Sequence, residues 1–307
     1  MSRAVRLLAL LLAALFLAAC GEDEPVVRVD LSRRSELAAP GPAQARALTY
    51  AYLPQYSHQV SYERHRLLVD HLRRATGLPL RQVFPDTFDE HEKMVQRGEI
   101  DISFSNPFVY VRLARAGARA FARTIEPSGR PDFRSQIIVR ADNRAIQTLD
   151  DCRGKRWIAV DPTSAGGYLF SLGLFHDHGI LPQDFSEIAF APGPGGKQEK
   201  VVLAVYSGTY EVGSVRDGTL DLLRDKVDLS QIRILAESRP YPGWVYAARS
   251  GLDPAVVQAV AAAMFALDPA DPEQARILHA ARFAGIIPST DTDFDPIRGL
   301  VAKLGLE

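Results

Sequence analysis

The stretch DPTSAGGYLF, residues 161–170, lies between two contrasting patterns. A run of β-favouring residues, 155–160, precedes it, and an apolar, helix-like run follows it. A strand that enters such a turn and then a helix brings free backbone N–H groups to the positive end of the helix dipole. The turn could therefore receive a small anion, with Ser164 as the N-cap and with Gly166 and Gly167 leaving the backbone open. An ordinary capped helix start has the same pattern.

The chain from Ala47 onward repeats this alternation of strand and helix signals. One set of strand-like and helix-like runs, including a single strand over 133–140, is followed by a second set that includes a helix over 216–225. This order predicts an α/β fold of two lobes that face each other across a ligand cleft. We expect residues 47–140 and 242–307 to form lobe 1 and residues 141–241 to form lobe 2. The crossings are expected near 140–144 and 238–241.

The N-terminus predicts export. Arg3 and Arg6 precede an apolar run, residues 7–19, which is too short to span a membrane and is typical of a signal peptide. The run ends in Leu-Ala-Ala-Cys20, which resembles a bacterial lipobox, so Cys20 is the expected lipidation site; a plain secretory signal is the alternative. Residues 21–46 mix charge, proline and small residues and are expected to be a flexible tether. The protein is thus predicted to be periplasmic or on the cell surface, held to the membrane by lipid.

Composition excludes several other functions. The formal net charge is −1, which argues against a nucleic-acid partner. With Cys20 lipidated, the second of the two cysteines, Cys152, has no disulfide partner and is expected to be a small packed residue, or else a reactive thiol. The sequence contains no metal-ligand motif and no nucleophile motif. The segment GPGGKQ is not a complete phosphate loop, because Lys197 is followed by Gln198 rather than by Ser or Thr. We therefore expect a monomeric binding protein without a cofactor or metal, not an enzyme.

Several polar residues follow the predicted strands. Ligands of open α/β sheets bind at the carboxyl ends of the strands, so these residues should converge on the cleft. An arginine among them could donate a bidentate pair of hydrogen bonds to an oxyanion. The residues expected on this basis are Tyr56, Ser105, Asn106, Ser164, Ala165, Gly166, Gly167 and Arg216.

Four segments together resemble a known family. They are IDISFSNPFVYVRLA (100–114), residues 133–170, KQEKVVLAVYSGTYEVGSV (197–215) and ILHAARFAGIIPSTDTDFDPIR (277–298). The chain from about Leu48 to Leu300 resembles the phosphate/phosphite/phosphonate-type substrate-binding proteins of bacterial ABC transporters. The resemblance implies a periplasmic-binding-protein-like fold with a two-strand hinge, and delivery of an unchanged ligand to a membrane permease.

The sequence departs from the family pattern at the turn. The family's anion loop usually reads Ser-Thr-Ser-Gly, whereas the matching residues here are Ser164, Ala165, Gly166 and Gly167. Gln198 stands where many members carry a ligand-facing His and is included in the expected site. Arg216 stands where members that hold an amino-phosphonate are often acidic, so a further negative charge on the ligand would be favoured.

The resemblance favours capture of a small oxyanion for an ABC transporter. The alternative is a ligand-sensing lipoprotein that partners a membrane sensor kinase, since closure of the same lobes could serve as its switch. From the sequence we also expect that Arg216→Ala weakens oxyanion binding much more than it weakens folding.

Overall fold

A computed structural model describes residues 47–306. The predicted signal peptide, the lipidation site Cys20 and the tether 21–46 lie outside these residues.

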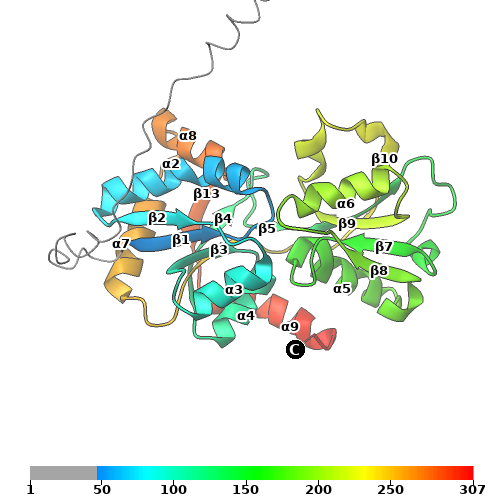
Figure 1. Ribbon diagram of the computed structural model, residues 1–307, viewed down its shortest axis with the longest axis horizontal. Helices are drawn as coiled ribbons and strands as arrows, with labels where there is room; N and C mark the ends of the chain where they lie inside the picture. The colour runs from blue at the N-terminus through cyan, green and yellow to red at the C-terminus, as the bar shows by residue number, and fades with distance from the viewer. Residues whose placement is uncertain (1–46, 307) are drawn as a thin grey trace, which may run out of the picture. The chain divides into compact units, whose positions relative to one another are not determined.

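The first sheet has six strands in the order β13-β4-β12-β3-β1-β2 (Figure 1). β1 pairs in parallel with β2 and β3, whereas β12 and β13 are antiparallel to the strands beside them. The carboxyl ends of β1, β3 and β4 therefore meet at one edge. The strands are β1 (Leu48–Tyr52), β2 (Leu80–Val83), β3 (Ile102–Ser105), β4 (Arg119–Ile125), β12 (Val245–Ala248) and β13 (Gly285–Pro288).

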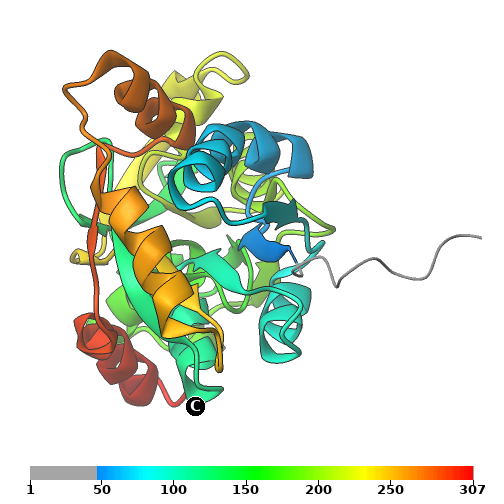
Figure 2. The same ribbon diagram turned by 90° about the vertical axis from the view of Figure 1, so that its left-hand side faces the viewer.

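Helices cover the first sheet on its two faces. α2 contacts α7 and α8, and α3 contacts α4. Figure 2 shows α7 running beside β13, and α7 contacts both β13 and β4. Local signals fix these helices: the Ser57 hydroxyl caps α2, the Asn106 carboxamide caps α4, and Gly77 ends α2 in the left-handed conformation. The helices are α2 (His58–Thr76), α3 (Phe88–Gln96), α4 (Pro107–Arg115), α7 (Pro254–Phe265) and α8 (Pro272–Ala281).

The second sheet has five strands in the order β10-β6-β9-β7-β8. β7 pairs in parallel with β8 and β9, and β6 is antiparallel to β9 and β10. Each face carries an apolar cluster, one around Trp157 and Phe175 and the other around Ile138 and Val201. The elements are β6 (Ser135–Arg140), β7 (Arg156–Ala159), β8 (Glu187–Phe190), β9 (Val212–Arg216), β10 (Ile232–Glu237), α5 (Phe170–Asp177) and α6 (Lys197–Tyr206).

Two connections join the sheets. β5 (Asp132–Phe133) and β11 (Tyr241–Pro242) form a two-stranded antiparallel pair, which confirms the predicted two-lobe fold with its two-strand hinge. The C-terminal helix α9 (Asp295–Lys303) serves both lobes: Leu300 belongs to the core of the first lobe, and Leu304, just after the helix, also packs against the Trp157 cluster of the second.

The structure differs from the sequence-based prediction at three places. The predicted strand 133–140 is interrupted at Arg134, and β6 already pairs with β9 and β10, so the first crossing precedes residue 135 rather than following residue 140. The predicted helix 216–225 shortens to a 3₁₀ turn, Leu220–Leu223, because Gly218 adopts a left-handed backbone with φ of 75°. The edge strand β13 was not predicted.

Cys152 is fully buried in the Trp157 cluster, and burial raises the pKa of its thiol to about 12. A thiol in this state is a packed residue rather than a reactive one.

Between residues 47 and 306, no helix combines the length and apolarity that crossing a membrane needs. The same residues contain no cluster of three or more His, Cys, Asp or Glu side chains that could hold a metal ion.

Candidate functional site

A cavity of about 530 Å³ lies between loops of the two lobes. The first lobe supplies an aromatic wall and two arginines, and the second lobe supplies the loop that follows β9. Three guanidinium groups line this one cavity, those of Arg64, Arg216 and Arg282. Such a concentration of cations suits an anionic ligand.

Arg216 ends β9 and is held in place on several sides. Its Nη2 donates to Glu126 Oε2 at 2.6 Å, its Nε donates to the carbonyl of Asp217, and its guanidinium lies 4.8 Å from the ring centre of Phe133. Burial alone would lower the pKa of Arg216, but Glu126, Tyr56, Asp217 and Tyr52 together outweigh it and raise that pKa, so the side chain stays charged. These bonds leave the Nη1 amino group for a ligand.

The packing around Gly166 leaves no room for the hydroxyl-bearing side chain that is usual in the family at this position. A Cβ on Gly166 would lie 2.8 Å from Cβ of Arg216 and 2.7 Å from a ring carbon of Phe133. The space that a side chain at residue 166 would need is therefore filled by the ring of Phe133 and by the Cα and Cβ atoms of Arg216.

Arg64 extends from α2 and lies over the aromatic residues of the first lobe. Its guanidinium carbon is 4.1 Å from the ring centre of Tyr56, and its Nη1 is 3.4 Å from the hydroxyl of Tyr52. The Tyr52 hydroxyl also accepts a hydrogen bond from Gln55 Nε2 at 2.8 Å. Burial raises the pKa of Tyr52 to about 12, so its hydroxyl stays protonated and can donate to an anion.

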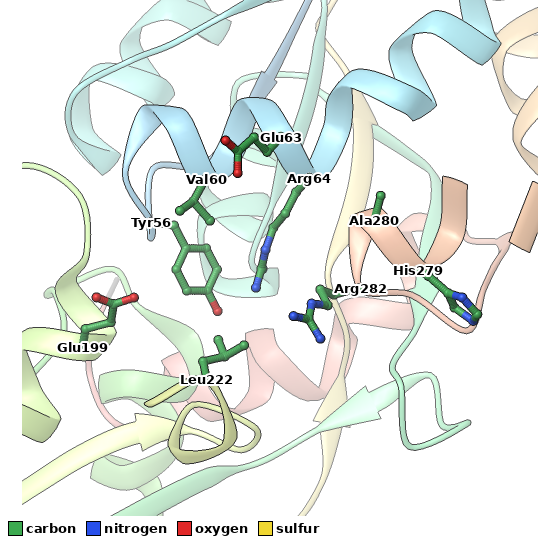
Figure 3. Close-up of a pocket in the computed structure, with 9 residues that line it drawn as sticks. All are labelled: Tyr56, Val60, Glu63, Arg64, Glu199, Leu222, His279, Ala280 and Arg282. Atoms are coloured by element: carbon green, nitrogen blue, oxygen red, sulfur yellow. The ribbon is translucent and has the colours of Figure 1, made fainter. Parts of the chain in front are cut away.

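Arg282 follows α8 and has an unusual backbone. It is the one non-glycine residue between 47 and 306 with a positive φ, 64°. Arginine takes this left-handed conformation at a cost, because its Cβ approaches the neighbouring backbone. Figure 3 shows the Arg282 guanidinium directed toward the same space as the Arg64 guanidinium and the Tyr56 hydroxyl.

The wall behind these groups is aromatic. Trp244 contacts Tyr52 and Phe104, with ring centres 5.4 and 5.1 Å apart. The indole N–H of Trp244 is buried and has no hydrogen-bond partner among the described residues. A buried donor without a partner is costly, so it marks a place where a ligand acceptor would be stabilised.

The turn after β7 uses its polar groups and its glycines for contacts within the protein. Ser164 Oγ accepts a hydrogen bond from the Gly167 N–H at 3.1 Å, as expected for an N-cap. A Cβ on Gly167 would lie 2.3 Å from Cγ2 of Val160, so this glycine is required for packing. Residues 165–169 form one π-helical turn that leads into α5.

A buried ion pair lies beside this turn. Lys197 Nζ is 2.6 Å from Asp161 Oδ2, and both side chains are about one-tenth exposed, at 11% and 12%. Asp161 Oδ1 accepts from both the N–H and the hydroxyl of Thr163. Lys197 is therefore already paired and holds the turn in shape.

The nine predicted site residues divide into two groups. Tyr56 and Arg216 line the cavity. Among the others, Gln198 accepts from the Arg216 N–H, Asn106 donates across the lobes to the carbonyl of Thr163 at 3.2 Å, and Gly166 packs against Arg216. The buried hydroxyl of Ser105 has no hydrogen-bond partner among the described residues. This second group comprises Ser105, Asn106, Ser164, Ala165, Gly166, Gly167 and Gln198.

Sequence reasoning missed Arg64, Arg282 and Glu126. Arg64 stands in a charged helix without a motif, and Arg282 lies in one of the segments that carried the family resemblance, with no feature to single it out. Trp244, which follows the second crossing, also lines the cavity.

Comparison with known families matches residues 50–294 to the family described as "ABC transporter, phosphonate, periplasmic substrate-binding protein". The chain belongs to this family. Family members are substrate-binding components of transporters rather than enzymes; they act outside the cytoplasm and work with a membrane permease.

Three relatives illustrate the match. The phosphate-import protein PhnD of Mycolicibacterium smegmatis is 27% identical over 279 residues, which are 85% of this chain and 86% of that protein. A binding protein of an ABC phosphonate transporter from Pseudomonas aeruginosa is 20% identical with a TM-score of 0.75, covering 84% of this chain and 86% of that one. PhnD1 of Prochlorococcus marinus, in complex with methylphosphonate, is 14% identical with a TM-score of 0.76, covering 84% and 98%. At these identities the two structures show the shared two-lobe fold.

Proposed function

We propose that this phosphonate-family binding protein captures a small phosphonate-like or phosphate-like oxyanion in the cavity beside Arg216 and delivers it to its permease. The observation that carries the proposal is a buried, permanently charged guanidinium that keeps an amino group free at a cavity between the lobes. We expect Arg216 Nη1 and the Tyr52 and Tyr56 hydroxyls to contact the oxyanion, with the Trp244 N–H as a further donor.

Charge balance supports this placement. Of the three acidic residues at the cavity, Glu126 is paired with Arg216 and Asp221 with Arg224. The third, Asp217, interacts with Arg216, and burial raises the pKa of its carboxyl. The acidic residues of the cavity are thus directed to Arg216 and Arg224, and no ion pair within residues 47–306 compensates Arg64 or Arg282, so the cavity favours an anion.

The predicted turn has a supporting role in this proposal. Residues 164–167 and Asn106 bring the lobes together and position Arg216, while ligand contact falls to the cavity residues. Transport is favoured over sensing by the family match, whose description is that of a transporter component.

A thermal-shift series tests ligand capture by the folded protein. Methylphosphonate, phosphite and phosphate are expected to raise the melting temperature, because a ligand that binds only the native state stabilises it. Chloride at the same ionic strength is the control. No shift with any of these oxyanions would reject the proposed function.

We also propose that the mature protein is anchored through lipid on Cys20. Cys20→Ser is expected to release the protein from the membrane fraction into the soluble extracytoplasmic fraction while leaving ligand affinity unchanged. Fractionation of cells that express both forms checks this expectation. Equal membrane association of the two forms would show that Cys20 is not the anchor.

A further inference from the structure

We propose that Arg64 and Arg282, beside Tyr56, form a second anion subsite at the mouth of the cavity, so that the ligand class is an oxyanion bearing a second anionic group. This inference rests on the proposed function, because it places the first oxyanion at Arg216.

Neither arginine forms an ion pair with a carboxylate, although Glu63 and Glu199 line the outer part of the hollow beside them. Within residues 47–306 the ion pairs include one for Arg216, to Glu126, but none for Arg64 or Arg282. The polar contacts of Arg64 are with tyrosines, which carry no charge at neutral pH. Two guanidiniums directed at one space repel each other, and an anion between them would remove that repulsion.

The two arginines also lie where two hollows meet. A second cavity of about 390 Å³ adjoins the first and shares with it Tyr56, Arg64, Leu222 and Arg282. Figure 3 shows the Arg64 and Arg282 guanidiniums and the Tyr56 hydroxyl converging there, above Leu222 from the other lobe. A ligand whose first group reaches Arg216 would therefore have its outer end among these three groups.

The backbone of Arg282 provides an independent sign. Glycine or asparagine is the usual residue at a left-handed helix C-cap, and Arg282 occupies that position at the end of α8. The cost of placing arginine there recurs at sites where a side chain is held for function. Within the described residues, the Arg282 side chain forms no hydrogen bond or ion pair that would explain an arginine at this position.

The experiment compares three probes in calorimetric titrations of the purified full-length protein. Phosphonoacetate carries a second anionic group, phosphonoacetamide is its neutral counterpart of nearly equal shape, and methylphosphonate lacks the group. The variants are Arg64→Gln and Arg282→Asn, since asparagine accepts the left-handed backbone. Arg66→Gln, an exposed arginine on the same helix, is the matched control. Melting temperatures establish that each variant is folded.

We expect the wild type and Arg66→Gln to bind phosphonoacetate at least tenfold more tightly than the other two probes. Arg64→Gln and Arg282→Asn should each reduce this preference to below threefold, because they lose much more affinity for phosphonoacetate than for methylphosphonate. Equal affinities of the wild type for the three probes would overturn the second subsite and leave the proposed function standing. An equal loss of affinity for all three probes in both variants would also overturn it, because only one oxyanion site would then exist. Failure of every probe to bind the folded wild type would reject both proposals.

Discussion

Replacing Arg216 by Met together with Glu126 by Gln is expected to leave the protein folded and to weaken oxyanion binding by two orders of magnitude or more. A hydrogen bond to a charged group contributes about 1.5–3 kcal/mol, so loss of two such bonds corresponds to roughly 10²–10⁴-fold in affinity. The double change is needed because both side chains of the pair are only 13% exposed. Calorimetry with methylphosphonate measures the loss.

For the single variant Arg216→Ala, the ion pair with Glu126 changes the result that we expect from the sequence alone. Arg216→Ala leaves the carboxylate of Glu126 buried without its partner, which costs about 3–5 kcal/mol of folding stability. Binding and folding should therefore both suffer, rather than binding alone. The control is Arg112→Met with Glu92→Gln, a pair at 2.7 Å between α4 and α3, which should leave affinity unchanged. Wild-type affinity in the folded Arg216→Met/Glu126→Gln variant would contradict a ligand role for Arg216.

Gly167→Ala is expected to destabilise the protein by about 3 kcal/mol, which is at the upper end for overpacking of a buried site. The added Cβ would lie 2.3 Å from Cγ2 and 2.5 Å from Cβ of Val160, which is fully buried. The Gly167 carbonyl also accepts from Ser214 Oγ at 2.7 Å, and Ser214 Oγ accepts from Trp157 Nε1 at 2.9 Å. A shift of the turn would strain this chain of hydrogen bonds.

Thermal denaturation measures this effect, with a fall in Tm on the order of 6–12 °C for about 3 kcal/mol in a domain of this size. Gly299→Ala is the control: it lies in α9 with nothing within 4 Å of the added Cβ, and it should raise stability by roughly 0.5–1 kcal/mol. A Gly167→Ala protein as stable as the wild type would show that the turn can move away from Val160.

The sequence predicted the fold because its signals are local. Strand runs such as 156–160 and helix caps such as Asn106 act within a few residues, and the structure contains both. The first crossing was misplaced because residues 133–140 read as one extended run, and the break at Arg134 arises from pairing with distant strands. β13 was missed because it has only four residues, Gly285–Pro288, and both a glycine and a proline are among them, which gives too short a signal.

The cavity was harder to predict because it is assembled from distant segments. Tyr56 and Arg216 follow strands, and a rule about strand ends could find them. Arg64 extends from the middle of a helix, and Arg282 acts from a helix end some 200 residues later in the chain. The role of Gly166 depends on where Arg216 lies, which no single segment reveals.

The most direct test of the central claim is the position of a bound oxyanion in a crystal. Methylarsonate, an analogue of methylphosphonate, carries an arsenic atom that anomalous diffraction locates. We expect the arsenic in the 530 Å³ cavity, with its oxygens within hydrogen-bond distance of Arg216 Nη1 and of the Tyr52 or Tyr56 hydroxyl. Arsenic bound where none of these three side chains reaches it would contradict the account.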